Sequence, residues 1–383
     1  MTETPPATQM LLRRINAQRV LDLLRTSGQP SRVAELAQAA KLSRPTVDAV
    51  VDDLLALGLV DPHEDAPTAG SSRARGRPAR RYGLRTRAAV VVGVDIGSQR
   101  VRAVAADLRG ETVGEVEAVV DPAAGRDGRL TALTRVIRQA AGGERLGAVA
   151  VGVPGVVADG DEVRESAVLP SLSGARLGGS LSRVLGCPVT VDNDANLAAL
   201  GERWLGVASD ARDMVFVLSG ERLGAGIILG GELVRGYDGS AGEMGFLSLL
   251  TVDHAAEGIG ALMRRAQREM YPARPPREPE DILRAAVAGE ADAVRIRDYA
   301  IDRAARAIAA VSMLLAPELV VIGGGVADAG HDLIDPLADR LGWLTAQPPR
   351  LAVSALGGRA VVAGALRLAL DVLEPTLLAD LGG

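Results

Sequence analysis

The stretch AAVVVGVDIGS, residues 88–98, decides the fold class of most of this chain. Its run of small and β-branched apolar residues is typical of a buried strand, which ends at Asp95 and is followed by Gly97. From here to the C-terminus, apolar strands alternate with turns and helices. This alternation predicts an α/β architecture.

Later apolar stretches end in the same kind of polar or glycine-rich turn. LGAVAVGVPGVV ends in Gly152-Val-Pro154-Gly155, and CPVTVDNDANLAALGERWLG passes from a strand into a helix through Asp192-Asn193-Asp194. MVFVLSGERLGAGIILGGELVRG predicts a hairpin, and SAGEMGF follows it. Near the end, ELVVIGGGVAD is a strand that runs into glycines. The apolar spacing also predicts helices over residues 130–141 and 360–373.

Ahead of this body, apolar residues at helical spacing predict three short helices. The first covers residues 14–27, and we expect Ser31 and Ser43 to cap the second and third. The close connection between the last two predicts a helix-turn-helix, whose exposed end presents Ser43, Arg44 and Thr46 to DNA. A helical bundle for protein contacts is the alternative. The predicted buried stripe of the third helix is Val47, Val50, Val51, Leu54 and Leu57.

A basic segment follows the predicted helix-turn-helix. Residues 66–87 hold seven arginines and no acidic residue. Arginines around Gly76 and Pro78 form a narrow cationic strip, which fits an A·T-rich minor groove. We expect it to be the wing of a winged helix, with residues 80–84 returning as a strand, and the alternative is a solvated linker. The expected DNA contacts in this strip are Arg73, Arg75, Arg77, Arg80 and Arg81.

A winged helix followed by DIG, GVPG, NDAN, AGEMG and VVIGGGV in this order resembles the ROK family (repressors, open reading frames and sugar kinases). The resemblance extends from about residue 11 to residue 373. It implies an actin-like, ribonuclease H-like body with ligand between two lobes. By this resemblance Asp95 would position phosphates and a metal ion, Asp194 would accept the proton of the attacking sugar hydroxyl, and Glu243 would bind sugar hydroxyls.

The chain also departs from the family's kinases. Their first loop has Gly-Gly-Thr where this chain has Gly97-Ser98-Gln99, and their second has Gly-Thr-Gly where this chain has Gly220-Glu221-Arg222. A carboxylate in that loop would repel ATP, and side chains would block the approach of its backbone. Phe246 replaces the histidine that touches sugar and zinc, the cysteines of the zinc loop are absent, and Val168 stands near a sugar-binding asparagine position. We therefore expect neither zinc nor ATP as a cofactor.

Asn193, Asp194 and Glu243 remain as the expected effector contacts, with no catalytic residue and no metal ligand assigned. A helix cap or the bracing of a turn is an equally good explanation of each retained acid.

Composition narrows the functional class. Residues 1–89 hold 14 Lys/Arg and 9 Asp/Glu, whereas the whole chain has a net charge of −5, so a basic N-terminal segment precedes an acidic body. One cysteine, Cys187, and three histidines exclude a disulfide framework and a cysteine-rich zinc site. The sequence has no apolar run long enough to span a bilayer and no export signal, so we expect a cytoplasmic protein.

The fold expected is α/β with an N-terminal α+β winged helix. Residues 1–65 would form the winged helix-turn-helix domain, 66–87 the arginine-rich wing or linker, and 88–383 the ROK-type body. The first lobe would comprise about 88–194 plus the helix 360–373, and the second about 195–358.

We interpret the protein as a transcriptional regulator, a repressor that binds a double-stranded DNA operator as a homodimer or higher homo-oligomer and responds to a small-molecule effector. The first alternative is a ROK sugar kinase with an appended DNA-binding domain. The second is a DNA-binding structural protein whose body only dimerises.

Overall fold

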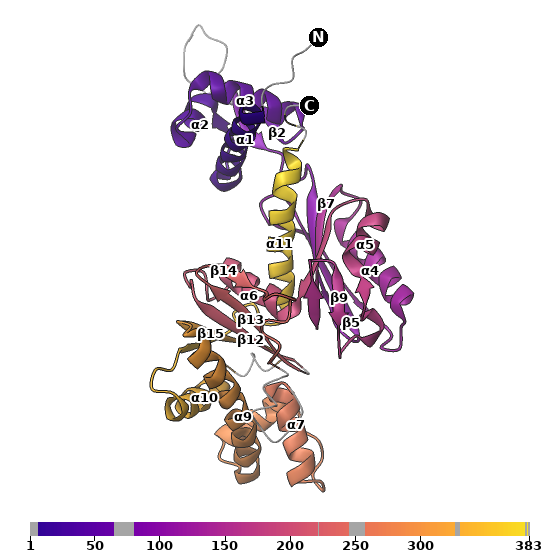
Figure 1. Cartoon of the computed structure of the whole chain (residues 1–383), viewed down its shortest axis with the longest axis vertical. Coiled ribbons are helices and arrows are strands. Elements are labelled where there is room, and N and C mark those ends of the chain that lie inside the picture. The colour runs from indigo at the N-terminus through magenta and orange to yellow at the C-terminus, as the bar shows by residue number, and fades with distance from the viewer. Residues whose placement is uncertain are drawn as a thin grey trace, which may run out of the picture.

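The computed structural model describes residues 7–64, 80–220, 222–244, 257–325, 330–379 and 381, and every structural statement below concerns these ranges. An N-terminal module, residues 7–64 and 80–85, lies at one end of the molecule (Figure 1). The rest of the described chain forms the body. The α/β body and the helical N-terminal module confirm the predicted fold class.

The N-terminal module is a winged helix-turn-helix. Val47, Val50, Val51 and Leu54 form the buried face of its third helix, as predicted, whereas Leu57 follows the helix and is half-buried. The Ser43 side chain accepts a hydrogen bond from Thr46 N at 3.3 Å. The short strands form one antiparallel sheet in the order β1-β3-β2. The elements are α1 (Ala7–Ser27), β1 (Ser31–Arg32), α2 (Val33–Ala40), α3 (Arg44–Ala56), β2 (Val60–His63) and β3 (Arg81–Leu84).

The cap predicted for the second helix is wrong by one residue. Ser31 lies in β1, paired with Tyr82, and α2 begins at Val33. The Glu35 carboxylate accepts a hydrogen bond from Arg32 N at 2.9 Å, so a side chain of the first turn satisfies the backbone there. Strand pairing with the wing therefore overrides the capping preference of serine.

The body contains two five-stranded sheets of the same topology. In each, three antiparallel strands are followed by two parallel ones, which is the repeated pattern of an actin-like, ribonuclease H-like fold. The first sheet has the order β11-β7-β4-β5-β6, and the second has the order β14-β13-β12-β15-β16. The strands of the first are β4 (Val90–Ile96), β5 (Arg100–Ala106), β6 (Thr112–Val119), β7 (Leu146–Val153) and β11 (Val189–Asn193). Those of the second are β12 (Met214–Ser219), β13 (Leu223–Leu229), β14 (Glu232–Val234), β15 (Leu319–Gly324) and β16 (Arg350–Val353).

Two helices lie between the sheets (Figure 1). Helix α6 (Asp194–Leu205) packs against β12 and β13, and α11 (Ala360–Leu377) packs against β4 and β7. The two helices also pack against each other, and α11 continues beyond the sheets to the N-terminal module (Figure 1). The helix predicted over residues 360–373 therefore lies inside the molecule. It packs between the two sheets and reaches the N-terminal module with its C-terminal end.

The remaining helices cover the outer faces of the sheets. Apolar residues of α4 pack on the first sheet, and those of α7, α8, α9 and α10 pack around the second. Within the described ranges, no helix combines the length and apolar character that crossing a bilayer requires. These elements are α4 (Arg126–Ala141), α5 (Leu177–Leu185), α7 (Ile259–Met270), α8 (Pro279–Val287), α9 (Ala291–Leu315) and α10 (His331–Leu344), with a small sheet of β8 (Val156–Ala158), β9 (Glu162–Glu165) and β10 (Ala175–Arg176).

Candidate effector site and DNA-binding surface

A cavity of about 500 Å³ lies where strand ends of the two sheets face each other. Strands β4, β7 and β11 are parallel, so their carboxyl ends meet at one edge of the first sheet and bring Asp95, Gly155 and Asn193 together. Strands β12 and β13 bound the cavity from the second sheet. Its described lining residues are Asp95, Ile96, Gly97, Ser98, Pro154, Gly155, Val156, Glu165, Ala167, Val168, Asn193, Asp194, Leu218, Gly220, Arg222, Gly224 and Glu243.

The GVPG turn depends on its last glycine. Gly155 has φ +147°, and a Cβ there would lie 2.2 Å from the Glu165 carbonyl oxygen. A side chain at this position would therefore push β9 away from the cavity wall. This close approach is the physical reason for the glycine in the motif.

Asn193 holds the cavity wall together. Its Oδ1 accepts hydrogen bonds from Ala195 N at 2.8 Å and Asn196 N at 3.1 Å, which caps α6. Its Nδ2 donates to the Gly155 carbonyl at 3.0 Å and to Glu243 Oε1 at 3.5 Å. The side-chain amide is therefore fully engaged, and Asn193 orients the groups around the cavity more than it offers a free contact.

The three acids predicted for the site lie together at the cavity. Burial raises the pKa of the Asp194 carboxyl to about 7, and the nearby Asp95 and Glu243 carboxylates act in the same direction. Burial also raises the pKa of Asp95 to about 6, against the opposing charge of Arg102. The pKa of Glu243 is raised by burial and opposed by Arg222. The carboxyl groups of Asp194 and Asp95 can therefore exchange protons near neutral pH.

The structure describes some, but not all, of the residues at which this chain departs from the kinase pattern. Ala167 and Val168 line the cavity, as the apolar replacement predicted, and Arg222 lies in its wall. Gln99 is exposed and is not a lining residue. Glu221 and Phe246 lie outside the described residues.

No group of three or more His, Cys, Asp or Glu side chains is arranged to hold a metal ion in the described part of the chain. The cysteine, Cys187, is buried in the core of the first sheet instead, and burial raises its thiol pKa. The described residues that line the cavity include carboxylates, an amide and an arginine, with no cysteine or histidine among them.

The first turn of α3 forms the candidate DNA-binding surface. Arg44 and Ser43 are exposed and Thr46 is half-buried. The Ser43 and Thr46 hydroxyls lie 2.7 Å apart, so both help to close the first turn. Arg44 has no hydrogen bond or ion pair with another described residue, which leaves its guanidinium available to a base or phosphate.

The arginine strip is described only at its end. Arg80 is exposed, whereas Arg81 donates to the Pro30 carbonyl at 3.2 Å and lies 3.5 Å from a Glu35 carboxylate oxygen. Arg81 thus also ties the wing to the helices. Arg73, Arg75 and Arg77 lie outside the described residues.

Two polar contacts escaped the sequence analysis. Arg235 after β14 pairs with Asp192 of β11, and Arg25 of α1 pairs with Glu374 of α11. The residues of these pairs are 43 and 349 positions apart, and nothing in their local patterns indicates a partner.

The two-sheet fold with a cavity between the lobes defines a protein of the actin-like, ROK-type class. The ROK family model matches residues 91–372, and the chain belongs to the ROK family. Residues 15–63 match the IclR helix-turn-helix domain.

Relatives of both kinds, enzymes and repressors, are similar to this chain. It is 33% identical over 290 residues to the bifunctional enzyme NanE/NanK of Brucella suis. The matched region covers 73% of this chain and 53% of that protein. The chain is 27% identical over 248 residues to the xylose repressor of Caldicellulosiruptor bescii, which covers 62% of this chain and 60% of the relative. The chain thus spans only about half of the length of the Brucella enzyme.

Among solved structures, a ROK family transcriptional regulator, described as a homologue of the Escherichia coli MLC protein, has a TM-score of 0.76. The likeness covers 96% of this chain and 98% of that one at 23% identity. It therefore supports the fold of the N-terminal module and the body together.

Proposed function

We propose that this protein is a transcriptional repressor of the ROK family, located in the cytoplasm, that binds a DNA operator as a homodimer or higher homo-oligomer. The observation that carries the proposal is Arg44 at the start of α3, which is exposed and has no hydrogen bond or ion pair with another described residue. The helix-turn-helix that presents it is joined to a body with a cavity large enough for a small molecule. Helix-turn-helix dimers match two half-sites, which supports the oligomer. The domain division at residues 65 and 87 is part of the proposal.

We further propose that a small-molecule effector binds in the cavity against Asp194 and Glu243. Each has one carboxylate oxygen without a hydrogen bond to another described residue, whereas the amide of Asn193 is used within the wall. Ala167 and Val168 make part of the wall apolar. We therefore do not expect a plain hexose bound as in the sugar-binding members of the family. A sugar hydroxyl that finds no hydrogen-bond partner in the site lowers the affinity of the site for that sugar.

Calorimetry tests the effector proposal. The relative named as a xylose repressor makes D-xylose one probe, with D-glucose and N-acetylglucosamine as the comparison. Tight binding of either comparison sugar that persists in Glu243→Gln contradicts the proposed site.

A sugar kinase is the second candidate, and one observation favours it. The pKa of Asp194, raised to about 7, suits a general base at neutral pH. Against it, the described lining residues include four acidic side chains and one basic side chain, so a triphosphate would meet net negative charge. The acidic residues are Asp95, Glu165, Asp194 and Glu243, and the basic residue is Arg222. We propose that neither ATP nor zinc is used.

Two experiments test the function. Footprinting of the protein across the genome should recover discrete sites with a shared sequence, and uniform binding would contradict a regulator. A coupled ADP-release assay over hexoses and amino sugars should give no turnover. Turnover of ~1 s⁻¹ or faster that Asp194→Asn abolishes would establish the kinase instead.

A further inference from the structure

Helix α11 packs against α6, which begins at the cavity, and its C-terminal end reaches the N-terminal module (Figure 1). At the cavity end it touches α6 backbone to backbone. A Cβ on Gly364 would lie 1.7 Å from the Leu197 carbonyl oxygen, and one on Gly201 would lie 2.3 Å from the Ala360 carbonyl oxygen. Since α6 begins at Asp194, its first residue lines the cavity and its middle holds α11.

A buried carboxylate fixes the start of α11 to the same helix. Glu202 of α6 has no exposed surface. It accepts hydrogen bonds from Ser354 Oγ and from Leu356 N at 3.3 Å, in the segment that leads into α11, and from Val207 N at 2.9 Å. The helices α6 and α11 are therefore attached by backbone contact and by a fully buried polar group, and a displacement of one carries the other.

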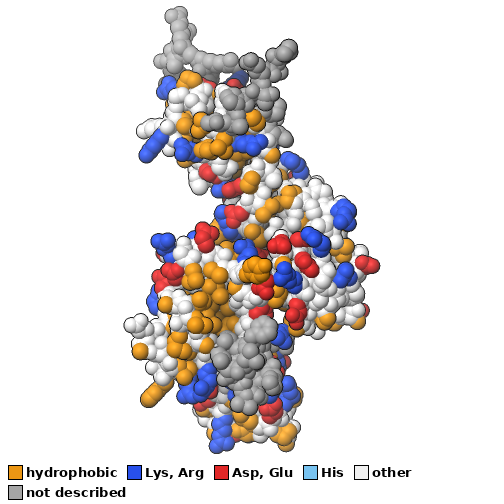
Figure 2. All heavy atoms as spheres, in the orientation of Figure 1, with side chains coloured by type: hydrophobic (Ala, Val, Ile, Leu, Met, Phe, Trp, Pro, Cys, Tyr) orange, Lys and Arg blue, Asp and Glu red, His pale blue; other side chains and the backbone are white. Residues whose placement is uncertain are grey.

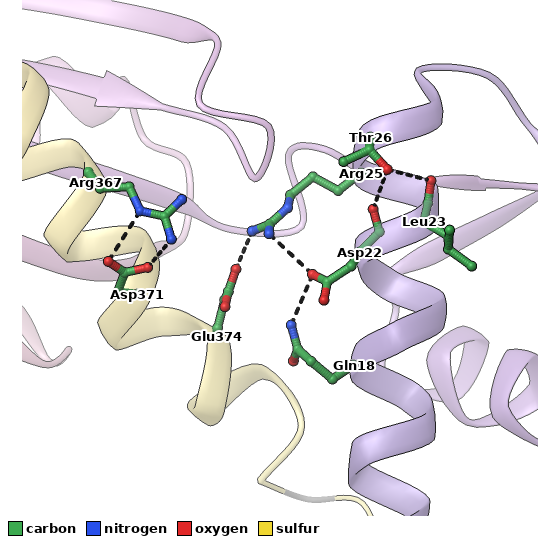
Figure 3. Close-up of polar contacts among 8 residues, drawn as sticks. All are labelled: Gln18, Asp22, Leu23, Arg25, Thr26, Arg367, Asp371 and Glu374. Atoms are coloured by element: carbon green, nitrogen blue, oxygen red, sulfur yellow. Dashed lines mark hydrogen bonds and ion pairs between the residues drawn. The ribbon is translucent and has the colours of Figure 1, made fainter. Parts of the chain in front are cut away.

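The other end of α11 contacts α1 of the N-terminal module. Leu21 and Leu84 face Leu370 and Leu373 across a crevice of about 20 Å³. Figure 3 shows Arg25 reaching from α1 to Glu374. The Nη2 atom of Arg25 also lies 3.1 Å from Asp22 Oδ1. The molecule is narrow where the N-terminal module joins the body (Figure 2). The Arg25–Glu374 pair joins α1 to α11 beside these apolar residues.

The last turn of α11 contains Pro375. Proline has no N–H to donate to the carbonyl of residue 371, so this turn lacks one backbone hydrogen bond. Helices bend at positions of this kind, so the end of α11 that touches the N-terminal module is where this helix can bend.

We propose that α11 transmits the state of the cavity to the N-terminal module, and that the Arg25–Glu374 ion pair sets the orientation of the module for DNA. The proposal rests on the proposed function, because it assigns the route from the cavity to the DNA-binding surface. Coupling of this kind requires one element whose position both sites influence, and α11 contacts both.

Hydrogen exchange of the full chain tests the ion pair without any DNA. In Glu374→Gln, the amides of α1 and of the last turns of α11 should exchange about two- to five-fold faster, as expected for one partly exposed ion pair. Asp371→Asn is the matched control, since Asp371 pairs with Arg367 on α11 and neither contacts α1 in Figure 3. The double exchange of Arg25→Glu with Glu374→Arg should restore the parent rate. Equal effects of Glu374→Gln and Asp371→Asn overturn the proposal.

A double-mutant cycle tests the coupling itself. Asp194→Asn removes a charge at the first residue of α6 and needs no ligand. In the parent it should change α1 exchange and operator affinity at least two-fold, and in the Glu374→Gln background that change should disappear. Additive effects, or no change in the parent, overturn the coupling. Failure to recover an operator sinks the proposed function instead and leaves the exchange result interpretable.

Discussion

Asp192 and Arg235 join the two sheets of the body beside the cavity: the guanidinium donates two hydrogen bonds to Asp192 Oδ2, at 2.9 and 2.7 Å. Asp192 lies at the end of β11, and its other oxygen accepts from Asn193 N and from Asn196 Nδ2. The ion pair thus reaches the residues that cap α6. Its side chains differ in exposure, 46% for Arg235 and 5% for Asp192.

Arg235→Gln should therefore lower the free energy of unfolding by about 1–3 kcal/mol, because it leaves a buried carboxylate without its charged donor. Urea denaturation at pH 7 measures the change. Arg176→Gln is the control, since Arg176 pairs with Asp161 but is 77% exposed. A loss no larger in Arg235→Gln than in the control would mean that the pair does not hold the sheets together.

The raised pKa values at the cavity predict a pH dependence of stability. Between pH 3.8 and about 7 the folded state holds the Asp194 proton more tightly than the unfolded chain does, so this group makes stability fall as pH rises across that window. Asp95 acts in the same direction up to about pH 6.

Asp194→Asn should consequently gain stability relative to the parent as pH is raised from 5 to 7, and the difference should level off above that. Urea denaturation of both proteins at four pH values from 5 to 8 provides the measurement. A difference that does not depend on pH would mean that Asp194 is ionised throughout.

Gly364→Ala should destabilise the body strongly, because its Cβ would lie 1.7 Å from the Leu197 carbonyl oxygen and α6 and α11 would have to separate. Overpacking of this kind costs about 1–3 kcal/mol or more. Gly342→Ala in α10 is the matched control, since a Cβ there meets nothing within 4 Å, and it should stabilise by up to ~1 kcal/mol. Thermal unfolding of the two variants should shift in opposite directions.

Arg44→Ala should relax sequence preference at one operator position, since a bidentate arginine–guanine contact contributes about 1–3 kcal/mol of discrimination. Arg19→Ala removes the same charge from an exposed position on α1 and serves as the control. Competition gel shifts with single-base operator variants measure the preference. Equal loss against every base in both variants would show that Arg44 contacts only phosphate.

Arg77→Ala tests the strip that the sequence predicts beyond the described residues. It should weaken binding to operators with A·T-rich flanks and reduce the slope of log affinity against log salt by about 1. Gel shifts over a salt series on A·T and G·C flanks measure both. Parent-like binding to both flanks would identify the segment as a linker.

The polar and glycine-rich strand ends could be predicted from the sequence because they depend on local pattern. Asp95, Asp194 and Glu243 lie at one cavity in the structure. The sequence did not predict that the amide of Asn193 would be consumed within the wall, since that depends on Gly155 and Glu243 arriving from elsewhere. The apolar pattern of residues 360–373 indicated a helix but not its place between two sheets. That place is made possible by glycines whose facing carbonyls lie more than a hundred residues away in the sequence.

The N-terminal module and the body share one apolar core, in which Leu21, Leu24 and Leu84 belong to the same cluster as Leu370 and Leu373. The module is consequently not an independent unit that can be exchanged between regulators at a linker. A chimera that takes residues 1–87 from another family member would place foreign side chains against the end of α11. Changing the DNA specificity of such a protein by module exchange therefore requires that the last turns of α11 be exchanged with it.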